Sequence, residues 1–589
     1  MMLTLLLMCM VTLGCNIRHV EAQPRTWTVD DDGSADFHTI QDAIDAATSG
    51  DTIYVHNGVY TEHLVVDKSL TLMGEESGLT IINGTLSETA IKITADNVQI
   101  SNFTIQEGYE GIHIVNSDEN TISENTIISN EFEGLWAENS TNNLIADNII
   151  SYNGWDGIYL DNVSHTNLRG NTIVSNNGSG VWLDASHDNS LEYNTMNNNE
   201  WEGVHMYIVS CTSLQRNTIV SNNESGVWLD ASHDNSLKYN TVSNNEWEGF
   251  YSRDSSSISF VGNTVSWNQY AGVTFDNVSA CTYHHNDFLN NSRQVISDNS
   301  TNAWDNGAEG NYWNDYTSSD LYKGPYQNVT GSDGIGDTSY FIDTKNSDSY
   351  PFMGRIDSLE VGTWDGTSQT ASIASNSTVS DLRFNNTERL IRFNVTGENS
   401  IGFSRVTVPE AVVQGLWQVG YTVLIDGEEP LILDEGTIEA HIYIYLTYLH
   451  SEHEIVIKGI PIPDTTPPTI TILSPENKTY ATNDVALNLT INEPISWIGC
   501  SLDNQDNVTI SGNITMVELP QGVHMVTVYA NDTAGNTGAS ENLHFSIEVD
   551  RDMTAVLSPE LIIAVIVTIA LGVSVLVYLA RRRGKKSKD

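Results

Sequence analysis

Aromatic and acidic side chains recur along this chain every 23 residues, so groups that can do chemistry stand at regular intervals. One column, meaning a set of residues 23 apart, contains His113, Trp136, Tyr159, Trp182, His205, Trp228 and Tyr251. Two residues further on, a second column contains Glu138, Asp161, Asp184, Tyr207, Asp230, Arg253 and Asp276. A third column precedes both and contains Tyr109, Phe132, Trp155, Trp201, Trp247 and Tyr270. If each period is one structural unit, equivalent residues stack into stripes.

Such stripes suit a sugar polymer, because aromatic rings stack on apolar sugar faces and carboxylates accept hydrogen bonds from hydroxyl groups. Exposed aromatic patches commonly mark binding sites. We therefore predict a surface that binds a glycan or polysaccharide. Its predicted residues are Trp136, Tyr159, Trp182 and Trp228 for stacking, and Asp161, Asp184 and Asp230 for hydroxyl groups or a bridging cation. The alternative is that the rings only stabilise the fold by stacking on one another.

The columns are interrupted where an enzyme could place its catalytic groups. The residues concerned are His205, Tyr207, Asp230, Tyr251 and Arg253. A Tyr or Arg that removes a proton, assisted by His or bound calcium, would suit a lyase or epimerase acting on an acidic polysaccharide. The alternative is that Arg253 only neutralises stacked carboxylates. "DASHDN" resembles the Asp-x-His motif of uronate epimerases, but it occurs twice within the repeat, unlike a single active site.

A cation site is predicted in "GSDGIGDTSYFID". Asp333, Asp337 and Asp343 alternate there with glycines, and carboxylate oxygens are the ligands that calcium prefers. The alternative is that this segment and "GNYWNDY" form a loop that closes the end of the repeat domain. The sequence predicts no cofactor other than calcium.

The elements that carry these columns are predicted to be short strands. In Gly180-Val181-Trp182-Leu183-Asp184 the apolar residues alternate, so Val181 and Leu183 share one face and Trp182 and Asp184 share the other. Two segments, 171–194 and 217–240, differ at only two positions. The strict period, with Asn, Gly and Ser at the turns, predicts a parallel β-helix with 23-residue coils.

Asparagines at one turn are predicted to stack from coil to coil through their side-chain amides. They stand at 102, 125, 148, 171, 194, 217, 240, 263 and 286. Asn102 also begins the glycosylation sequon "NFT". Because the ladder would bury it, we predict that Asn102 escapes glycosylation.

Two stretches carry a family resemblance. "DDDGSADFHTIQDAIDAATSGDTIYVHNGVYTEHLVVDKSLTLMGE" resembles the opening of right-handed β-helix proteins related to pectin esterases and pectate lyases. The coils, "GNYWNDY" and "DGIGDTSYFIDTKNSDSYPFM" resemble the NosD-type β-helix domain of many archaeal surface proteins. The resemblance covers residues 25–353 and implies a right-handed parallel β-helix. NosD proteins are linked to copper delivery, which makes metal handling a further alternative, but no Cys/Met/His cluster supports it here.

Two further β domains are predicted after the β-helix. Residues 356–463 contain alternating strands without the 23-residue period, which predicts a β-sandwich. Residues 464–548 resemble the Ig-like repeats of archaeal and bacterial surface proteins, and residues 549–560 are a predicted linker. We expect these two domains to form a stalk.

Both ends of the chain indicate a cell-surface location. Residues 1–22 are predicted to be a signal peptide. Residues 561–580 carry no charge and are long enough to span a bilayer as a helix. The basic tail, 581–589, follows at once and places the C-terminus in the cytoplasm. The predicted protein is a single-pass membrane protein with its N-terminal ectodomain outside.

Charge and composition narrow the choice of partner. The formal net charge of −51 disfavours nucleic acid and suits cations or sugars, although acidity also keeps proteins soluble in salty media. Only Cys211, Cys281 and Cys500 remain after the predicted signal peptide, so no disulfide framework is expected. Sequons throughout the ectodomain predict a glycoprotein. No protein partner is indicated.

Overall fold

The computed structural model describes residues 24–549, except 365, 399, 431, 439, 461 and 462. It divides into two compact units, one ending at Ile460 and the other beginning at Pro461. The predicted signal peptide, membrane span and basic tail, and all but the first residue of the predicted linker, lie outside the described residues. Among the residues that are described, no helix has the length and apolar character needed to cross a bilayer.

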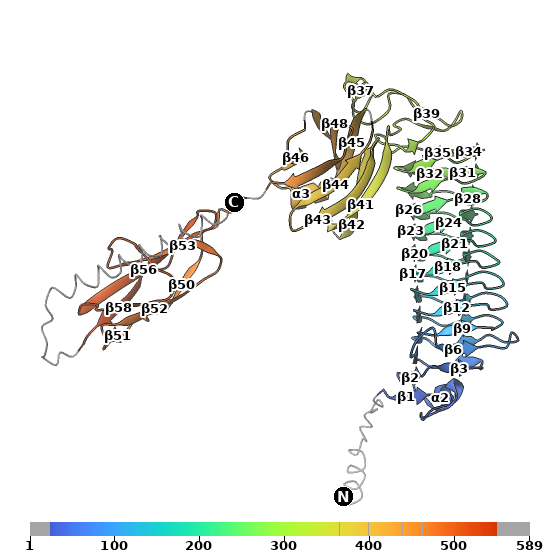
Figure 1. Ribbon diagram of the computed structural model, residues 1–589, viewed down its shortest axis with the longest axis horizontal. Helices are drawn as coiled ribbons and strands as arrows, with labels where there is room; N and C mark the ends of the chain where they lie inside the picture. The colour runs from blue at the N-terminus through green and yellow to red at the C-terminus, as the bar shows by residue number, and fades with distance from the viewer. Residues whose placement is uncertain are drawn as a thin grey trace, which may run out of the picture. The chain divides into compact units, whose positions relative to one another are not determined.

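A parallel β-helix forms the first part of unit one, as predicted (Figure 1). Each coil contributes one strand to each of three parallel sheets. One sheet has 13 strands, from β1 (Thr26–Val29) to β35 (Thr301–Ala303). Another has 12, from β3 (Gly58–Tyr60) to β36 (Tyr312–Trp313). The third, with 11 strands, carries the predicted stripe.

We call this third sheet the stripe sheet. Its strands pair in parallel and in chain order, with equivalent residues of successive coils side by side. They are β4 (Leu64–Val66), β7 (Ile91–Ile93), β10 (Ile112–Val115), β13 (Leu135–Glu138), β16 (Ile158–Asp161), β19 (Val181–Asp184), β22 (Val204–Tyr207), β25 (Val227–Asp230), β28 (Glu248–Arg253), β31 (Ala271–Asp276) and β34 (Val295–Asp298).

Alternating side chains build the bore. In β19, Val181 and Leu183 are fully buried, whereas Trp182 and Asp184 are partly exposed. Ile173 of the same coil is also buried in this core. Each coil thus buries a few aliphatic side chains that its neighbours cover. Each 23-residue repeat of the sequence therefore corresponds to one coil of the β-helix.

The asparagine ladder is confirmed from Asn125 onward. Asn171 is typical: its Nδ2 donates to Asn194 Oδ1 at 3.0 Å and to the Ile145 carbonyl at 2.7 Å. Its Oδ1 accepts from the backbone and side-chain amides of Asn148. These side chains are about 1% exposed, so the ladder satisfies buried turn amides that water does not reach.

The prediction that Asn102 belongs to this ladder is wrong. The coil that ends at Asn125 is one residue short, so the backbone N–H of Phe103, not of Asn102, donates to Asn125 Oδ1 at 3.1 Å. Phe103 is buried in the bore. Asn102 lies at the adjoining turn, half-buried, with a φ of 62°. The stated reason for its escaping glycosylation therefore does not hold.

Both ends of the bore are covered. The helix α2 (Ile40–Ala46) buries Ile40 and Ile44 against the first coils. At the other end Trp313 of "GNYWNDY" is fully buried and stacks on Phe288, with ring centroids 4.3 Å apart. Its Nε1 donates to Asp348 at 2.9 Å. This segment is therefore a cap, as the alternative interpretation predicted.

A β-sandwich follows within unit one. Its two sheets enclose an apolar core, and α3 (Glu410–Leu416) packs into it. One sheet has the order β41 (Arg355–Trp364), β42 (Thr367–Ser375), β45 (Ile401–Pro409), β48 (His441–Leu449), β47 (Ile432–Ile438). The other has the order β43 (Thr378–Asn385), β44 (Leu390–Thr396), β49 (His453–Gly459), β46 (Tyr421–Ile425).

A buried ion pair joins the sandwich to the cap. Arg405 of β45 contacts Glu309 of the cap through Nε at 2.9 Å and Nη2 at 2.8 Å, and both side chains are buried. His285 lies 2.8 Å from the other Glu309 oxygen. Burial alone would raise the pKa of Glu309, but Arg405 and His285 hold it well below its usual value. The sandwich is thus joined to the β-helix cap by buried contacts, and its expected role in a stalk stays a prediction.

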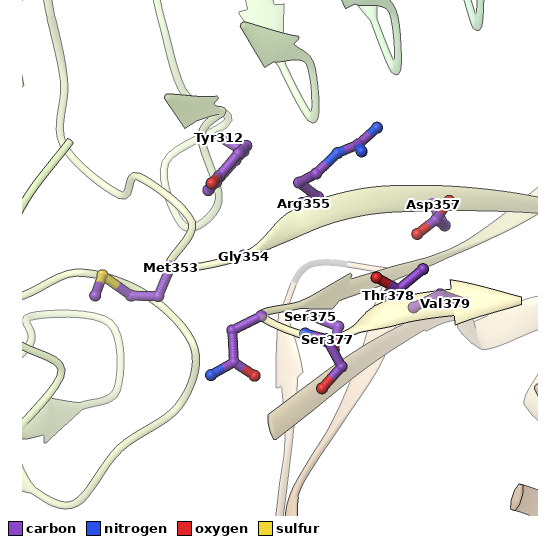
Figure 2. A pocket seen from close by; sticks show the side chains of 10 residues that line it. Tyr312, Met353, Gly354, Arg355, Asp357, Ser375, Ser377, Thr378 and Val379 are labelled. Atoms are coloured by element: carbon purple, nitrogen blue, oxygen red, sulfur yellow. Dashed lines mark hydrogen bonds between the residues drawn. The ribbon is translucent and has the colours of Figure 1, made fainter. Parts of the chain in front are cut away.

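A hollow of about 290 Å³ lies at this junction. Figure 2 shows Met353 and Gly354 leading from the cap into β41 beside it. Tyr312 and Arg355 line one side of it. Arg355 already pairs with the buried Asp287, Nε to Oδ2 at 3.4 Å. The hollow therefore belongs to the joint between the two domains.

Unit two is a smaller two-sheet β domain with its own apolar core. One sheet has the order β50 (Ile470–Ser474), β52 (Val485–Ile491), β55 (Ile514–Met516). The other has the order β51 (Thr479–Tyr480), β58 (Leu543–Ile547), β56 (Gly522–Asp532), β53 (Ile495–Leu502), β54 (Val508–Thr509), with β57 (Thr537–Ala539) on β56. Its Ig-like kinship stays a prediction.

Candidate functional site

The stripe sheet places the predicted stacking residues side by side. Trp136 pairs with Tyr159, and Trp182 lies between Tyr159 and His205 in the strand register. Trp228 continues the column after His205. We call this column the inner ladder; it consists of His113, Trp136, Tyr159, Trp182, His205, Trp228 and Tyr251.

Rings of the inner ladder contact one another along its whole length. Trp182 and His205 stack with centroids 4.5 Å apart and planes 4° apart. His205 stacks in turn on Trp228, and Trp228 contacts Tyr251 at 4.6 Å. Such pairs contribute about 0.5–1.5 kcal/mol each beyond their burial. Stacking therefore stabilises the fold, yet the rings of Trp136 to Tyr251 remain partly exposed on the surface.

Indole N–H groups of the inner ladder lack protein partners. Nε1 of Trp136, Trp182 and Trp228 is shielded from solvent, and each donates to no protein atom. A buried donor without an acceptor costs about 1–3 kcal/mol. Stacking alone does not explain why this column uses tryptophan, because phenylalanine would stack without that cost.

A second line of rings, the outer row, runs beside the inner ladder. Its members are Tyr109, Phe132, Trp155, Trp201, Trp247 and Tyr270. Backbone hydrogen bonds connect this position from coil to coil, for example Phe132 N to the Tyr109 carbonyl at 2.8 Å. Most of these rings are well exposed, Trp247 at 54%. The ring centroids of Trp182 and Trp201 lie 6.1 Å apart, so the two lines of rings contact each other.

Carboxylates that the sequence analysis missed lie between the two lines of rings. We call them the carboxylate row: Glu110, Glu133, Asp156, Glu202 and Glu248. Asp156 is 1% exposed and Glu202 3% exposed. The signal was present in the sequence, because each acid directly precedes a glycine of the 23-residue glycine column. Its position between flanking aromatic residues was not recognised as a site.

Burial shifts the pKa values of carboxyl groups in this row. It raises the pKa of Asp156 to about 8, and the charges of Glu133 and Glu202 add to the effect. Asp156 is therefore largely protonated at neutral pH. Glu202 behaves oppositely: burial alone would raise its pKa, but His205, whose Nδ1 lies 3.5 Å away, lowers it. Burial and a hydrogen bond to Glu202 raise the pKa of Glu224 to about 7.

The predicted carbohydrate acids occupy the column two residues on. Asp161 and Asp184 pair in register and are partly exposed. Burial and the neighbouring Asp161 raise the pKa of Asp184. Asp230 has a different environment, because it is paired with Arg253 of the next coil.

The five catalytic candidates are neighbours on the stripe sheet, and their catalytic role stays a prediction. His205 and Tyr207 share the outward face of β22. Arg253 holds Asp230 with two nitrogens, one of them Nε at 3.2 Å, as the charge-neutralising alternative predicts. Burial and Asp276 raise the pKa of Tyr251, whereas a tyrosine that acts as a base needs a lowered pKa.

The calcium candidates are not brought together as one ligand set. Asp333 is buried and accepts from Gly324 N, Ile335 N and Gln327. Asp337 accepts from the backbone of 321–322, and Asp343 from the backbone of 345–346. Within the described residues, the acidic triplets close enough to share an ion are instead 30–32 and the set Asp464, Glu493 and Asp532.

Comparison with known proteins agrees with the fold. A family model described as a right handed beta helix region matches residues 89–232 and 156–312. A cell surface glycoprotein of Methanothermus fervidus is 45% identical over 97 residues, 16% of this chain and 16% of that protein. Halomucin of Haloquadratum walsbyi is 33% identical over 99 residues, 15% of this chain and 1% of that protein. The chain thus matches only a small share of either relative's length.

Solved structures show distant similarity. The Azotobacter vinelandii mannuronan C-5 epimerase AlgE6 A-module has a TM-score of 0.35 at 14% identity, covering 45% of this chain and 93% of that chain. An alginate lyase from Paenibacillus sp. str. FPU-7 has a TM-score of 0.35 at 12% identity, covering 47% and 99%. No residue role transfers at this distance. The NosD-type resemblance stays a prediction.

Proposed function

We propose that this is a cell-surface β-helix protein that binds an extended glycan along the stripe sheet. The observation that carries the proposal is the surface itself: two adjoining lines of rings, a row of carboxyl groups between them, and indole N–H groups without protein acceptors. Rings would cover the apolar faces of sugars. Hydroxyl groups would donate to the partly exposed carboxylates of Asp161 and Asp184.

A neutral glycan fits this surface better than a polyuronate. The chain has a formal net charge of −51, and the only Lys or Arg in the two columns of the stripe between His113 and Asp276 is Arg253. That residue is already paired with Asp230. A polyanion would therefore meet repulsion unless cations screened it.

The proposal is tested on a glycan array probed with the purified full chain in detergent. We expect retention of neutral, linear polysaccharides. Failure to retain any glycan, in the presence and absence of calcium, would sink the proposal. The calcium arm also tests whether a cation at Asp333, Asp337 and Asp343, or between the stripe carboxylates, contributes.

An anchored polysaccharide enzyme is the second candidate, because the stripe contains a carboxyl group whose pKa is raised to near neutral. Glu202, Glu224 and His205 interact, and the pKa of Glu224 is raised to about 7 by burial and by Glu202. The Glu224 carboxyl could therefore act as a general acid or base near neutral pH. Incubation with neutral and acidic polysaccharides, followed by product analysis, decides this: new reducing ends, unsaturated ends or changed uronate composition would establish catalysis.

The surface location is also part of the proposal. It is supported by residues 1–22, 561–580 and 581–589 and by the similarity to a cell surface glycoprotein. Expression of a chain that ends before Leu561 is the test, and we expect a soluble product. A truncated chain that stayed with the membrane fraction would place the anchor elsewhere.

A further inference from the structure

Tryptophans on the stripe alternate between the two lines of rings. Six successive coils contain one tryptophan each at these two positions, in the order Trp136, Trp155, Trp182, Trp201, Trp228 and Trp247. The first, third and fifth belong to the inner ladder, and the second, fourth and sixth to the outer row. The tryptophans therefore form a zigzag that repeats every two coils, or 46 residues.

From Asp156 onward the polar groups follow the same two-coil period, whereas Glu110, Glu133 and Asp156 stand in three successive coils. Coils with an outer tryptophan place a buried acid next to it, as in Trp201–Glu202 and Trp247–Glu248. The coil before each of these two supplies a serine instead: Ser179 Oγ donates to Glu202 at 2.9 Å and Ser225 Oγ to Glu248 at 2.8 Å. Coils with an inner tryptophan contain an indole N–H that is shielded from solvent and has no protein partner.

The fold does not require this period. The bore repeats every coil, as the asparagine ladder shows with Asn148, Asn171 and Asn194 in consecutive coils. The near-identical segments 171–194 and 217–240 account for part of the pattern. Trp136 and Trp155 lie upstream of both segments and keep the alternation. The two-coil period thus belongs to the outward face.

We infer that the stripe is matched to a linear glycan with a two-residue repeat, in which each sugar is turned over relative to the one before. Neighbouring coils are about 4.8 Å apart, close to the length of one extended pyranose, and two coils span about 9.6 Å. A chain along the β-helix axis would place one sugar on each coil. Its alternating faces would meet inner and outer tryptophans in turn. This inference rests on the proposed glycan binding.

The test compares oligosaccharides of matched length and different geometry. Titration calorimetry of the full chain would use β-1,4-linked gluco-, N-acetylglucosamine and manno-oligosaccharides of two to eight residues. The control series is α-1,4-linked malto-oligosaccharides, which coil. We expect at least one β-1,4 series to bind tenfold or more tightly than the control, with affinity rising in steps of two residues.

Four other outcomes overturn the inference. Equal affinity for the control series, or a uniform rise with each added sugar, leaves glycan binding intact and removes the two-residue match. Binding of only non-extended glycans on the array has the same meaning. Absence of all glycan binding removes the proposed function as well.

A variant pair tests the zigzag directly. Trp201→Ala combined with Glu224→Trp keeps six tryptophans but moves one outer ring by a single coil. Glu224→Gln controls for the lost carboxyl group, and Trp267→Ala, at a 59% exposed tryptophan outside both lines of rings, controls for ring removal. We expect the double variant to lose tenfold or more in affinity for the β-1,4 series and to lose the two-residue steps. Wild-type binding by a folded double variant overturns the inference.

Discussion

The asparagine ladder and the stripe share one backbone period but differ in how their polar groups are satisfied. Asn194 uses its whole amide: Oδ1 accepts twice from Asn171, and Nδ2 donates to the Leu168 carbonyl and to Asn217. Trp182, in the same coil, donates its indole N–H to no protein atom. Complete internal pairing is typical of a structural element. A buried donor that the protein leaves unpaired is atypical of a purely structural element.

Breaking the ladder should have the largest effect on stability. Asn194→Ala leaves several buried groups without partners, each at about 1–3 kcal/mol, so we expect a loss of at least about 3 kcal/mol. The urea midpoint, followed by circular dichroism, measures it. Asn177→Ala, at an exposed asparagine in the same coil, is the matched control and should shift the midpoint little. Equal midpoints for the two variants would contradict a structural ladder.

Removing two rings from the stripe should weaken glycan binding more than it lowers stability. Trp182→Ala with Trp228→Ala removes rings without opening the bore, since Val181 and Leu183 stay in place. We expect stability to fall by roughly 1 kcal/mol per lost stacking pair. Glycan affinity should fall by about 2 kcal/mol per ring, on the order of thirtyfold each. Unchanged affinity, or a chain that no longer folds, would favour the purely structural role.

Asp156 makes the stripe sensitive to pH, whereas the ladder carries no charge. Burial raises its pKa from 3.8 to about 8, so the folded state holds a proton that the unfolded state releases. The contribution of Asp156 to stability is therefore greatest near pH 4 and falls as pH rises toward 8. Asp156→Asn should flatten this fall, by up to about 1.4 kcal/mol per pKa unit, and change little at pH 4. Urea midpoints from pH 4 to 9 test it; parallel curves would contradict the burial argument.

The smallest effect is expected at Arg253. Its side chain is 42% exposed, so its pair with Asp230 contributes at most about 1 kcal/mol. Arg253→Ala should leave both the urea midpoint and neutral-glycan affinity nearly unchanged. If the wild-type chain cleaved or epimerised a uronate polymer and this variant did not, the enzyme interpretation would replace the binding one.

Periodicity made the fold predictable, and the prediction failed where the period changed. Strand alternation and the 23-residue columns predicted the β-helix, the stripe register and the ladder from Asn125. A single missing residue moved Phe103 into the position assigned to Asn102. Nothing local in the sequence marks that deletion, because Asn102 has the expected residue type.

Such patterns cannot predict contacts between segments that are distant in the sequence. Glu309 and Arg405 are 96 residues apart in the chain and belong to different domains, so no spacing indicates that they pair. The 23-residue spacing locates the carboxylate row in the sequence. Only the structure shows that these acids are buried between two lines of aromatic rings. The calcium candidates show the reverse: suitable residue types stand close in sequence, but Asp337 and Asp343 accept hydrogen bonds from backbone amides of two separate segments.

The coil-by-coil construction also bears on how such a surface can evolve. Each coil contacts mainly its two neighbours, so copying a pair of coils inserts a piece that already fits at both joins. The near-identical segments 171–194 and 217–240 are a trace of such copying. Duplicating two coils lengthens the zigzag and keeps its phase, whereas duplicating one would set two like coils together and break it. Selection for a longer binding surface for the same polymer would therefore lengthen the β-helix in steps of 46 residues.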